Sequence, residues 1–162
     1  MTIRRAMPSD AAAISALWNL HITTRLTTFN SAPKTDLQVA AQIEQLQNDG
    51  FGFWVAVDES AVLGFAYYGQ FRGGIGYAHT MEHTIYVADG AAGRGYGRRL
   101  LNAVETDART KSAHVMMAGV SAENGPGIAF HARCGYIEVA RLTDVGRKFD
   151  RWLDLVLMQK FL

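Results

Sequence analysis

Apolar and polar residues recur along this chain with two periods, one typical of helices and one typical of strands. A first helix is expected to open at residues 8–10, with Ser9 as its N-cap, and to bury an apolar stripe at helical spacing. Residues 21–33 are rich in Thr, Ser and Asn and indicate a loop or a broken helix. Thr35 and Gln38 have the spacing of a capping box, which predicts a second helix ending at Gly50.

The rest of the chain changes to the period of strands, interrupted by two further helices. Leu100, Leu101 and Val104 predict one helix, and the other is expected between Asn124 and Gly135. Residues 143–150 are expected to form a loop. The predicted strands are residues 2–5, 53–57, 62–68, 82–87, 115–120 and 136–142, with a last strand on which Leu153, Leu155 and Leu157 alternate.

The predicted order of elements is β-α-α-β-β-β-α-β-α-β-β. This order favours a mixed α/β fold, in which helices pack on a largely antiparallel sheet that contains one parallel βαβ crossover. The chain has 162 residues, which predicts a single domain over residues 1–162.

Composition narrows the class of protein further. Aliphatic, aromatic, Met and Cys residues make up 49% of the chain and charged residues 19%, which indicates a globular fold. A net charge of +1 argues against a strongly cationic nucleic-acid-binding protein. No apolar run is long enough for a membrane span, and the first residues do not resemble a signal peptide. The one cysteine, Cys134, excludes an intrachain disulfide and fits a reducing, cytoplasmic setting.

The sharpest local signal is a glycine-rich turn between a strand and a helix. Gly93, Gly95 and Gly97 follow strand 82–87 and lead into the helix, whose free N–H groups would point into the turn. Such a turn suits a phosphate or pyrophosphate, and three arginines lie nearby: Arg94, Arg98 and Arg99. The spacing is not that of a dinucleotide-binding turn or a P-loop. A tight βα connection with a solvated basic face remains the alternative.

The glycine turn resembles the acetyl-CoA pyrophosphate loop of the GCN5-related N-acetyltransferase (GNAT) superfamily. Asn124, residues 129–131 and residues 134–136 resemble its second cofactor segment, whereas residues 82–87 and 148–154 are similar to the phosphinothricin and methionine-sulfone acetyltransferase subgroup. The resemblance implies a mostly antiparallel sheet of about six or seven strands with about four helices, and acetyl-CoA between two splayed strands. It implies cofactor contacts from Ile85, Tyr86, Val87, Gly93, Arg94, Gly95, Tyr96, Gly97, Arg98 and Asn124.

Transfer of an acetyl group to an amine requires that the amine lose a proton. In a strand, Glu82, Thr84 and Tyr86 share one face, while His83 and Ile85 share the other. With the resemblance, Glu82 is the expected base; without it, a solvent-facing strand glutamate is the ordinary alternative.

The other expected roles also have structural alternatives. His131 stands where many superfamily members have a Tyr that protonates the leaving thiolate, but it is equally explained as a packed polar helix residue. Asn124 is also a good N-cap. Arg72 is either a clamp for a substrate carboxylate or a solvated loop arginine. The resemblance implies a substrate site formed by Arg72, Gly73, Gly74, Glu82, His83 and Thr84.

The expected activity is direct transfer from acetyl-CoA to the α-amine of a small amino acid or analogue, such as phosphinothricin, methionine sulfone or methionine sulfoximine. The resemblance also implies a homodimer. One rival is a non-catalytic acetyl-CoA sensor. Another is a zinc hydrolase, because His79, Glu82 and His83 spell H-x-x-E-H. That motif needs a helix; four residues along a strand span roughly 13 Å, too far for two imidazoles to share one ion. No metal is therefore expected.

Overall fold

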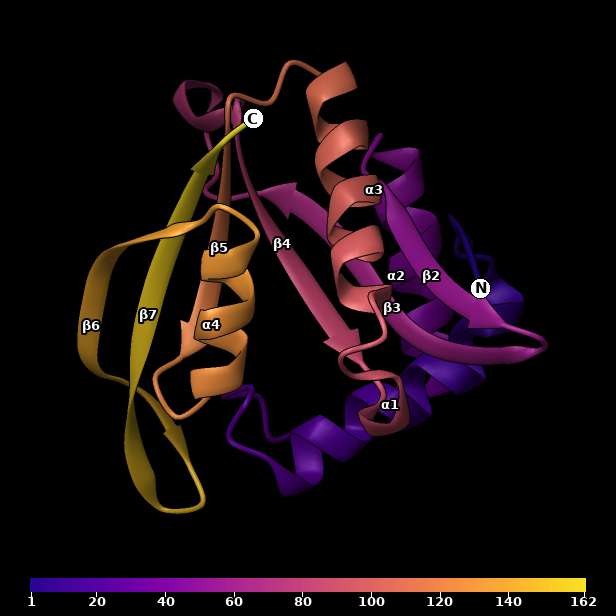
Figure 1. Ribbon diagram of the computed structural model, residues 1–162, viewed down its shortest axis with the longest axis horizontal. Helices are drawn as coiled ribbons and strands as arrows, with labels where there is room; N and C mark the ends of the chain where they lie inside the picture. Colours follow the sequence, from indigo (N-terminus) through magenta and orange to yellow (C-terminus); the bar gives the residue numbers. More distant parts are fainter.

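The computed structural model describes residues 1–162, which form one seven-stranded sheet with helices on both faces (Figure 1). The predicted order of helices and strands is confirmed. The helices are α1 (Ala11–Thr24), α2 (Asp36–Asn48), α3 (Tyr96–Thr110) and α4 (Gly125–Arg133). The strands are β1 (Thr2–Arg5), β2 (Phe53–Asp58), β3 (Ala61–Gln70), β4 (Thr80–Val87), β5 (Val115–Ser121), β6 (Ile137–Lys148) and β7 (Arg151–Phe161).

The strands lie in the order β1-β2-β3-β4-β5-β7-β6, and every neighbouring pair except β4–β5 is antiparallel. The parallel pair is also the shortest, with three residue pairs from Thr80↔Val115 to Glu82↔Met117. Beyond Glu82 the two strands separate, as Figure 1 shows. The fold class expected from the sequence is confirmed, including the single parallel crossover through α3.

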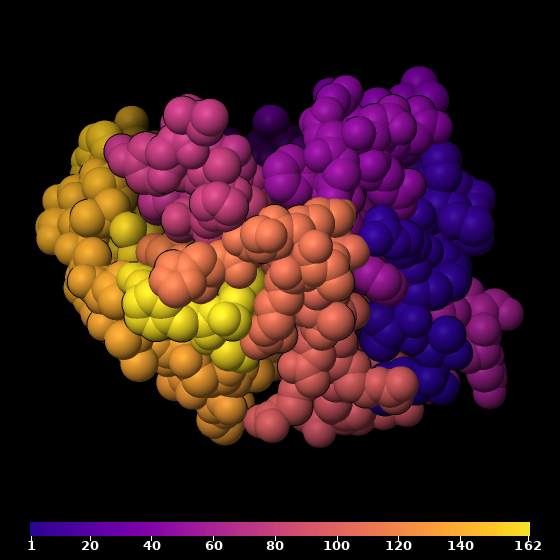
Figure 2. Space-filling model, turned by 90° about the horizontal axis from the view of Figure 1, so that it is seen from above, coloured from indigo at the N-terminus to yellow at the C-terminus, as the bar shows by residue number.

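Two apolar cores form because each face of the sheet is covered by a different helix pair. On one face, α1 and α2 pack on β2 and β3 through residues such as Trp18, Ile43 and Phe65. On the other face, α3 packs through Leu100, Leu101 and Val104, and this core continues across β5 and β7. The C-terminal end of the chain lies beside the segment that connects α3 to β5 (Figure 2). Leu162 packs against the second core and donates its N–H to the carbonyl of His114. None of the helices combines the length and hydropathy that crossing a bilayer requires.

The two predicted helix starts have different outcomes. The capping box is confirmed, since Thr35 Oγ1 accepts from the Gln38 N–H and Gln38 Oε1 accepts from the Thr35 N–H. The prediction that Ser9 caps α1 is wrong. Asp10 takes that place because its carboxylate accepts the Met7 N–H at 2.8 Å and both Arg4 guanidinium nitrogens, which folds Pro8–Asp10 into a 3-10 turn before α1.

The predicted loop at residues 143–150 is wrong as well. Strand β6 continues to Lys148 and pairs with β7, and the turn comprises only Phe149 and Asp150, both with positive φ. A bulge between Leu142 and Gly146 shifts the register, so the alternation of apolar and polar residues that marks a strand is interrupted there. The bulge turns the end of the β6–β7 hairpin toward the chain that follows α1.

Candidate functional site

The candidate site lies where β4 and β5 separate. Strand β4 remains paired with β3 as far as Val87↔Gly64, but its other edge has no strand partner after Glu82. Backbone groups of residues 83–87 that face β5 are therefore free to pair with an extended ligand, as an open sheet edge does. Ile85, Tyr86 and Val87, for which the family resemblance implies cofactor contacts, all lie on this free edge.

Glu82 is the last residue of β4 that pairs with β5. Its side chain is half-buried, and burial alone raises the pKa of its carboxyl group, since no hydrogen bond or ion pair offsets the burial. A carboxylate whose pKa is raised toward neutral pH is a better proton acceptor than a solvated one. The structure therefore places a half-buried carboxylate without a partner at the point where the strands separate.

Glycines flank Glu82 on both neighbouring strands, a placement that the sequence pattern does not reveal. Gly69 on β3 is the register partner of Glu82, and a Cβ there would meet open space. Gly119 on β5 lies against the carboxylate, and a Cβ there would lie 3.0 Å from Glu82 Oε1. The missing side chains leave room beside the carboxylate. Glycine within a strand is a signal of close approach, but only the register shows which residue it serves.

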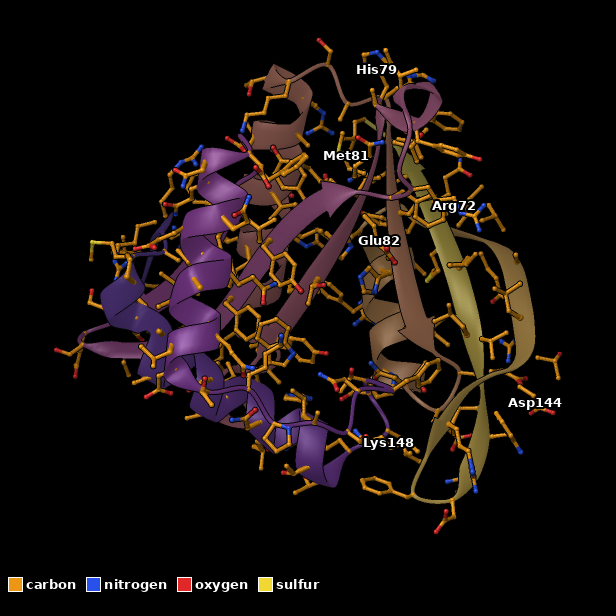
Figure 3. All side chains as sticks on the ribbon, turned by 180° about the vertical axis from the view of Figure 1, so that it is seen from behind. Arg72, His79, Met81, Glu82, Asp144 and Lys148 are labelled. Carbon is orange, nitrogen blue, oxygen red and sulfur yellow. The ribbon has the colours of Figure 1, made fainter.

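Arg72 begins the loop that connects β3 to β4. The loop leaves the sheet directly after the pairs Gly69↔Glu82 and Gln70↔Met81, and Figure 3 shows Arg72 and Glu82 in this part of the molecule. The Gln70 side-chain amide donates to the carbonyls of Arg72 and Gly74 at 2.5 and 2.8 Å, which holds the loop in shape. Arg72, Gly73 and Gly74 are all exposed.

Two of the three glycines predicted in the turn, Gly93 and Gly95, precede α3, whereas Gly97 lies in the first turn of that helix. Gly93 and Gly95 have φ of +74° and +86°, and Gly95 directly precedes the first turn of α3. Both face open space where a Cβ would be. Such a turn before a helix start presents free N–H groups and the positive end of the helix dipole, an arrangement suited to phosphate.

Two of the three arginines near the turn, Arg94 and Arg98, have partners within the protein. Arg94 lies over the Tyr96 ring at 5.3 Å and 3.4 Å from Asp58 Oδ2, while Arg98 approaches the carbonyl of Arg133 at 3.5 Å. The Tyr96 hydroxyl donates to the same Asp58 oxygen at 2.7 Å. The backbone of the turn, more than these side chains, is therefore free of contacts within the protein.

On the opposite face of β4 from Glu82 lies a cluster of buried rings, formed by His83, His131 and Tyr136. The two imidazoles have centroids 5.1 Å apart, and both have lowered pKa values because burial disfavours their charged forms. His131 Nδ1 donates to the Gly127 carbonyl at 2.7 Å, so in the neutral ring the proton is on Nδ1, and the buried Nε2 has no partner. The Tyr136 hydroxyl donates to Glu105 at 3.0 Å.

Asn124 caps α4, since its Oδ1 accepts from the Gly127 N–H at 3.0 Å. Its Nδ2 would clash with a Cβ on residue 127 at 2.3 Å, so Gly127 makes room for the cap. The cap uses Oδ1, so the Nδ2 amide of Asn124 remains at the start of α4, the helix that packs on β5.

The H-x-x-E-H residues do not come together. His79 is exposed, and its Nδ1 contacts the Ser112 carbonyl at 2.7 Å, while Glu82 and His83 lie on opposite faces of β4. No group of three or more His, Cys, Asp or Glu side chains is close enough to hold a metal ion.

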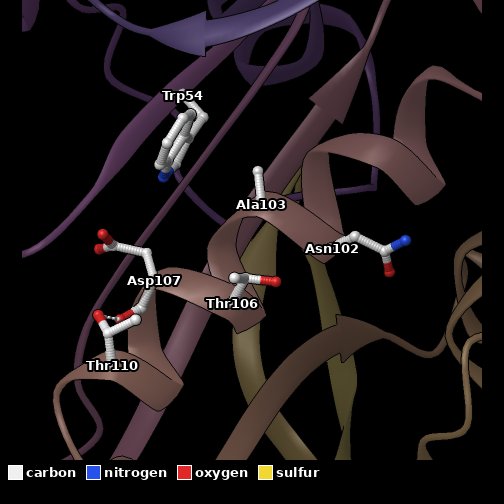
Figure 4. Close-up of a pocket in the computed structure, with 6 residues that line it drawn as sticks. All are labelled: Trp54, Asn102, Ala103, Thr106, Asp107 and Thr110. Atoms are coloured by element: carbon white, nitrogen blue, oxygen red, sulfur yellow. Dashed lines mark hydrogen bonds between the residues drawn. The ribbon is translucent and has the colours of Figure 1, made fainter.

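A separate hollow of about 350 Å³ lies between β2 and the outer side of α3, beside Trp54 and Asp107 (Figure 4). Asp107 is already bound by Arg5 and by the Tyr68 hydroxyl, each at 2.7 Å. This hollow lies beside β2, and β3 separates β2 from β4 in the sheet. The Asp107 carboxylate joins α3 to β1 through Arg5 and to β3 through Tyr68.

Known proteins share this architecture. The sequence profile of the Acetyltransferase (GNAT) family matches residues 14–136. An L-methionine sulfoximine/L-methionine sulfone acetyltransferase of Salmonella typhimurium is 35% identical over 98% of this chain and 93% of its own length. A ribosomal-protein-alanine N-acetyltransferase from Brucella melitensis has a TM-score of 0.96 and 39% identity, with 100% of both chains covered.

A third similar protein was solved with the cofactor. The phosphinothricin acetyltransferase from Sinorhizobium meliloti in complex with acetyl-CoA has a TM-score of 0.93 and 28% identity, covering 99% of this chain and 88% of that one. The free edge of β4 and the open glycine turn fit the extended arm and the pyrophosphate of such a molecule. The chain therefore belongs to the acetyltransferase (GNAT) family and is an N-acetyltransferase that uses acetyl-CoA as co-substrate.

Proposed function

We propose that this enzyme acetylates the α-amine of a small free amino acid or amino-acid analogue of the phosphinothricin or methionine sulfone/sulfoximine type. The observation that carries the proposal is the position of Glu82, a half-buried carboxylate without a partner, flanked by Gly69 and Gly119 at the start of the splay. The name of the Salmonella typhimurium relative supports the substrate class.

The cofactor is held mainly by backbone. The free edge formed by Ile85, Tyr86 and Val87 pairs with the extended arm, and the residues of the glycine turn enclose the pyrophosphate. When bound, acetyl-CoA supplies an activated acetyl thioester. A free N–H on the β4 edge stabilises the charge that develops on the thioester oxygen. Asn124 adds a side-chain amide from the opposite strand's end, where it also caps α4.

Glu82 takes the proton from the substrate ammonium, directly or through one water, so that the amine can attack. Arg72 binds the substrate carboxylate in a charge-assisted, bidentate contact. Gly73 and Gly74 allow the loop backbone to approach the same ligand, and Thr84, on the Glu82 face of β4, lines the way between Glu82 and Tyr86. His83 lies behind this surface and supports it from the other face.

We propose direct transfer in a ternary complex. Cys134 is half-buried at the end of α4, and burial raises the pKa of its thiol, which disfavours an acyl-carrying thiolate. His131 is the proposed proton donor to the leaving thiolate. Its Nδ1–H is bound to Gly127 and burial lowers the pKa of the ring, so the resting imidazole is neutral and Nε2 is unprotonated. In the proposed step, Nε2 takes the second proton that the attacking amine loses and passes it to the leaving thiolate.

We also propose a homodimer in a reducing, cytoplasmic setting. The β6–β7 hairpin exposes Ile137, Phe149 and Trp152, whose relative exposures are 63, 53 and 61%. Ile137 lies at one end of this hairpin and the other two at its turn, so exposed apolar side chains extend along its length, as is typical of a protein interface. Light scattering at working concentration tests this part, and a monomer would contradict it.

A panel of amines tests the acceptor, with thiol release from acetyl-CoA as the measurement. Methionine sulfone, methionine sulfoximine and phosphinothricin should give the highest kcat/KM, and the decarboxylated amine of methionine sulfone is the matched control. A peptide with an N-terminal alanine belongs in the panel because of the name of the Brucella melitensis structure. If that peptide or a polyamine is preferred, the proposed acceptor is wrong. Binding of acetyl-CoA without turnover of any amine would instead support a sensor.

A further inference from the structure

We propose that Lys148 is a positioning residue that ties the loop after α1, residues 25–30, to the β6–β7 hairpin and thereby sets the width of the β4–β5 opening on the Glu82 face. The proposal rests on the proposed function in one respect, namely that the acceptor enters on this face. The ammonium group does not act on substrate; it acts through the loop that it holds.

The ammonium of Lys148 binds three backbone carbonyls in the loop and at the end of α1. The residue is 3% exposed, and its Nζ donates to the carbonyls of His21, Arg25 and Thr28 at 3.2, 2.6 and 2.9 Å. An ammonium has three N–H donors, so each donor has one acceptor. No carboxylate pairs with it. Burial lowers the pKa of Lys148, and the carbonyl dipoles at the C-terminal end of α1 favour its charged form.

A second contact joins the same hairpin to the same loop. Gly146 and Lys148 are two residues apart on β6 and share a face, while Arg147 points to solvent. A Cβ at Gly146 would lie 2.3 Å from the Phe29 ring, so the ring rests directly on the β6 backbone. The bulge between Leu142 and Gly146 brings this face of the hairpin onto the loop.

The other side of the loop is fixed to the end of β4. Arg25 binds Asp89 through two hydrogen bonds of 2.8 and 2.5 Å, and the His21 ring lies 4.8 Å from the ring of Tyr86. His21 also contacts Thr27 Oγ1 at 2.9 Å. The loop is thus tied to the chain after β4 through Arg25 and to the hairpin next to β5 through Lys148, while His21, near the end of α1, packs on Tyr86 of the cofactor edge.

The loop matters because it connects the two sides of the opening, and the sheet itself does not hold β4 and β5 together beyond Glu82. Only three residue pairs join β4 to β5, so contacts that bridge the open end determine its width. On the face opposite Glu82, the bridge is the contact of Gly97 with Phe130, so close that a Cβ on Gly97 would lie 3.2 Å from the ring. On the Glu82 face, the bridge is the loop held by Lys148, and Figure 3 shows Lys148 at this end of the site.

The test compares Lys148→Met with Arg147→Met, which changes the adjacent, solvent-facing cation on the same strand. Lys148→Met keeps the aliphatic stem and removes the three donors. We expect the KM for the amine acceptor to rise about tenfold, equivalent to about 1.4 kcal/mol, with a change of less than about twofold in the KM for acetyl-CoA. Trypsin should cleave faster after Arg25. Arg147→Met should change none of these quantities.

A merely structural lysine would lower the thermal midpoint and leave both KM values and the cleavage rate unchanged, and that result would overturn the proposal. If Lys148→Met does not fold, Phe29→Ala removes the second contact and should shift acceptor KM and cleavage in the same direction, by a smaller factor; no shift there also overturns it. Cleavage after Arg25 does not depend on the acceptor, so a wrong substrate class and a wrong role for Lys148 give different results.

Discussion

The proposed cofactor side and the proposed acceptor side of the β4–β5 opening are constructed differently. The cofactor side is nearly continuous in sequence, from Ile85 to Arg98, and its important groups are backbone groups and glycines with positive φ. The acceptor side joins Gly69 and Arg72, Glu82, Gly119 and the loop after α1, which come from four separate parts of the chain.

This difference predicts opposite responses to mutation. Where backbone makes the site, most side chains can change without effect, and only a residue that alters the backbone or fills the space matters. Where a single carboxylate or guanidinium performs the chemistry, its removal leaves no substitute. The tests below should therefore separate acceptor effects, which appear in kcat or acceptor KM, from cofactor effects, which appear in the KM for acetyl-CoA.

The largest effect is expected for Glu82→Gln. Loss of a general base typically costs about 10²–10⁴-fold, and we expect that loss in kcat, with the KM for acetyl-CoA nearly unchanged. Activity should recover partly at high pH, because the amine then loses its proton to solvent. Glu44→Gln, an exposed carboxylate on α2, is the control. A pH–rate profile identical to that of the unmodified enzyme would remove Glu82 from the base role.

Arg72→Ala should have the next largest effect. A hydrogen bond to a charged group contributes roughly 1.5–3 kcal/mol, which corresponds to about 10–150-fold in kcat/KM for an acceptor that has a carboxylate. The matching decarboxylated amine should lose far less. Arg141→Ala on the exposed face of β6 serves as the control. Equal losses for both amines would show that Arg72 does not bind the carboxylate.

The cofactor side is predictable from sequence because its signals are local. A strand, a glycine turn and a helix follow one another without interruption, so the φ values of Gly93 and Gly95 can be anticipated from residue type alone. The face on which Glu82 lies is predicted as well, since side chains alternate along a strand. The capping box of α2 is predictable for the same reason: both partners lie within four residues.

The acceptor side is only partly predictable because it depends on register and on distant contacts. That Gly69 and Gly119 flank Glu82 follows from strand pairing, which residue type does not reveal. Lys148 falls in a predicted loop because a bulge interrupts the strand pattern before it. The resemblance groups His83 with the substrate, although alternation already puts it on the opposite face, where it packs against His131.

Gly95→Asn sharpens the cofactor half of the comparison. Asn tolerates a positive φ better than other non-glycine residues, so the variant mainly adds a side chain where the turn faces open space. We expect a rise of about tenfold in the KM for acetyl-CoA, equivalent to about 1.4 kcal/mol, and little change in acceptor KM. Gly90→Asn, in the 3-10 turn that precedes the glycine turn and without a positive φ, is the control. Normal acetyl-CoA binding by folded Gly95→Asn would refute the phosphate assignment.

The smallest expected effect concerns stability. Burial raises the pKa of Glu82 in the folded protein above its unfolded value. Below the pKa of the unfolded state, the carboxyl is protonated in both states, so its burial costs no charge desolvation. As the pH rises through the pKa of the folded state, the folded protein must hold a half-buried carboxylate and therefore loses stability. Glu82→Gln removes that charge, so its thermal midpoint should exceed that of the unmodified protein by roughly 1–3 °C at pH 7, and the gain should vanish near pH 4. Calorimetry at both pH values measures this, with Glu44→Gln as the variant expected to show no pH-dependent gain. If the thermal midpoint rose equally at both pH values, side-chain packing and not the desolvated charge would distinguish the two proteins. Glu82 would then lack the raised pKa on which its proposed role as base depends.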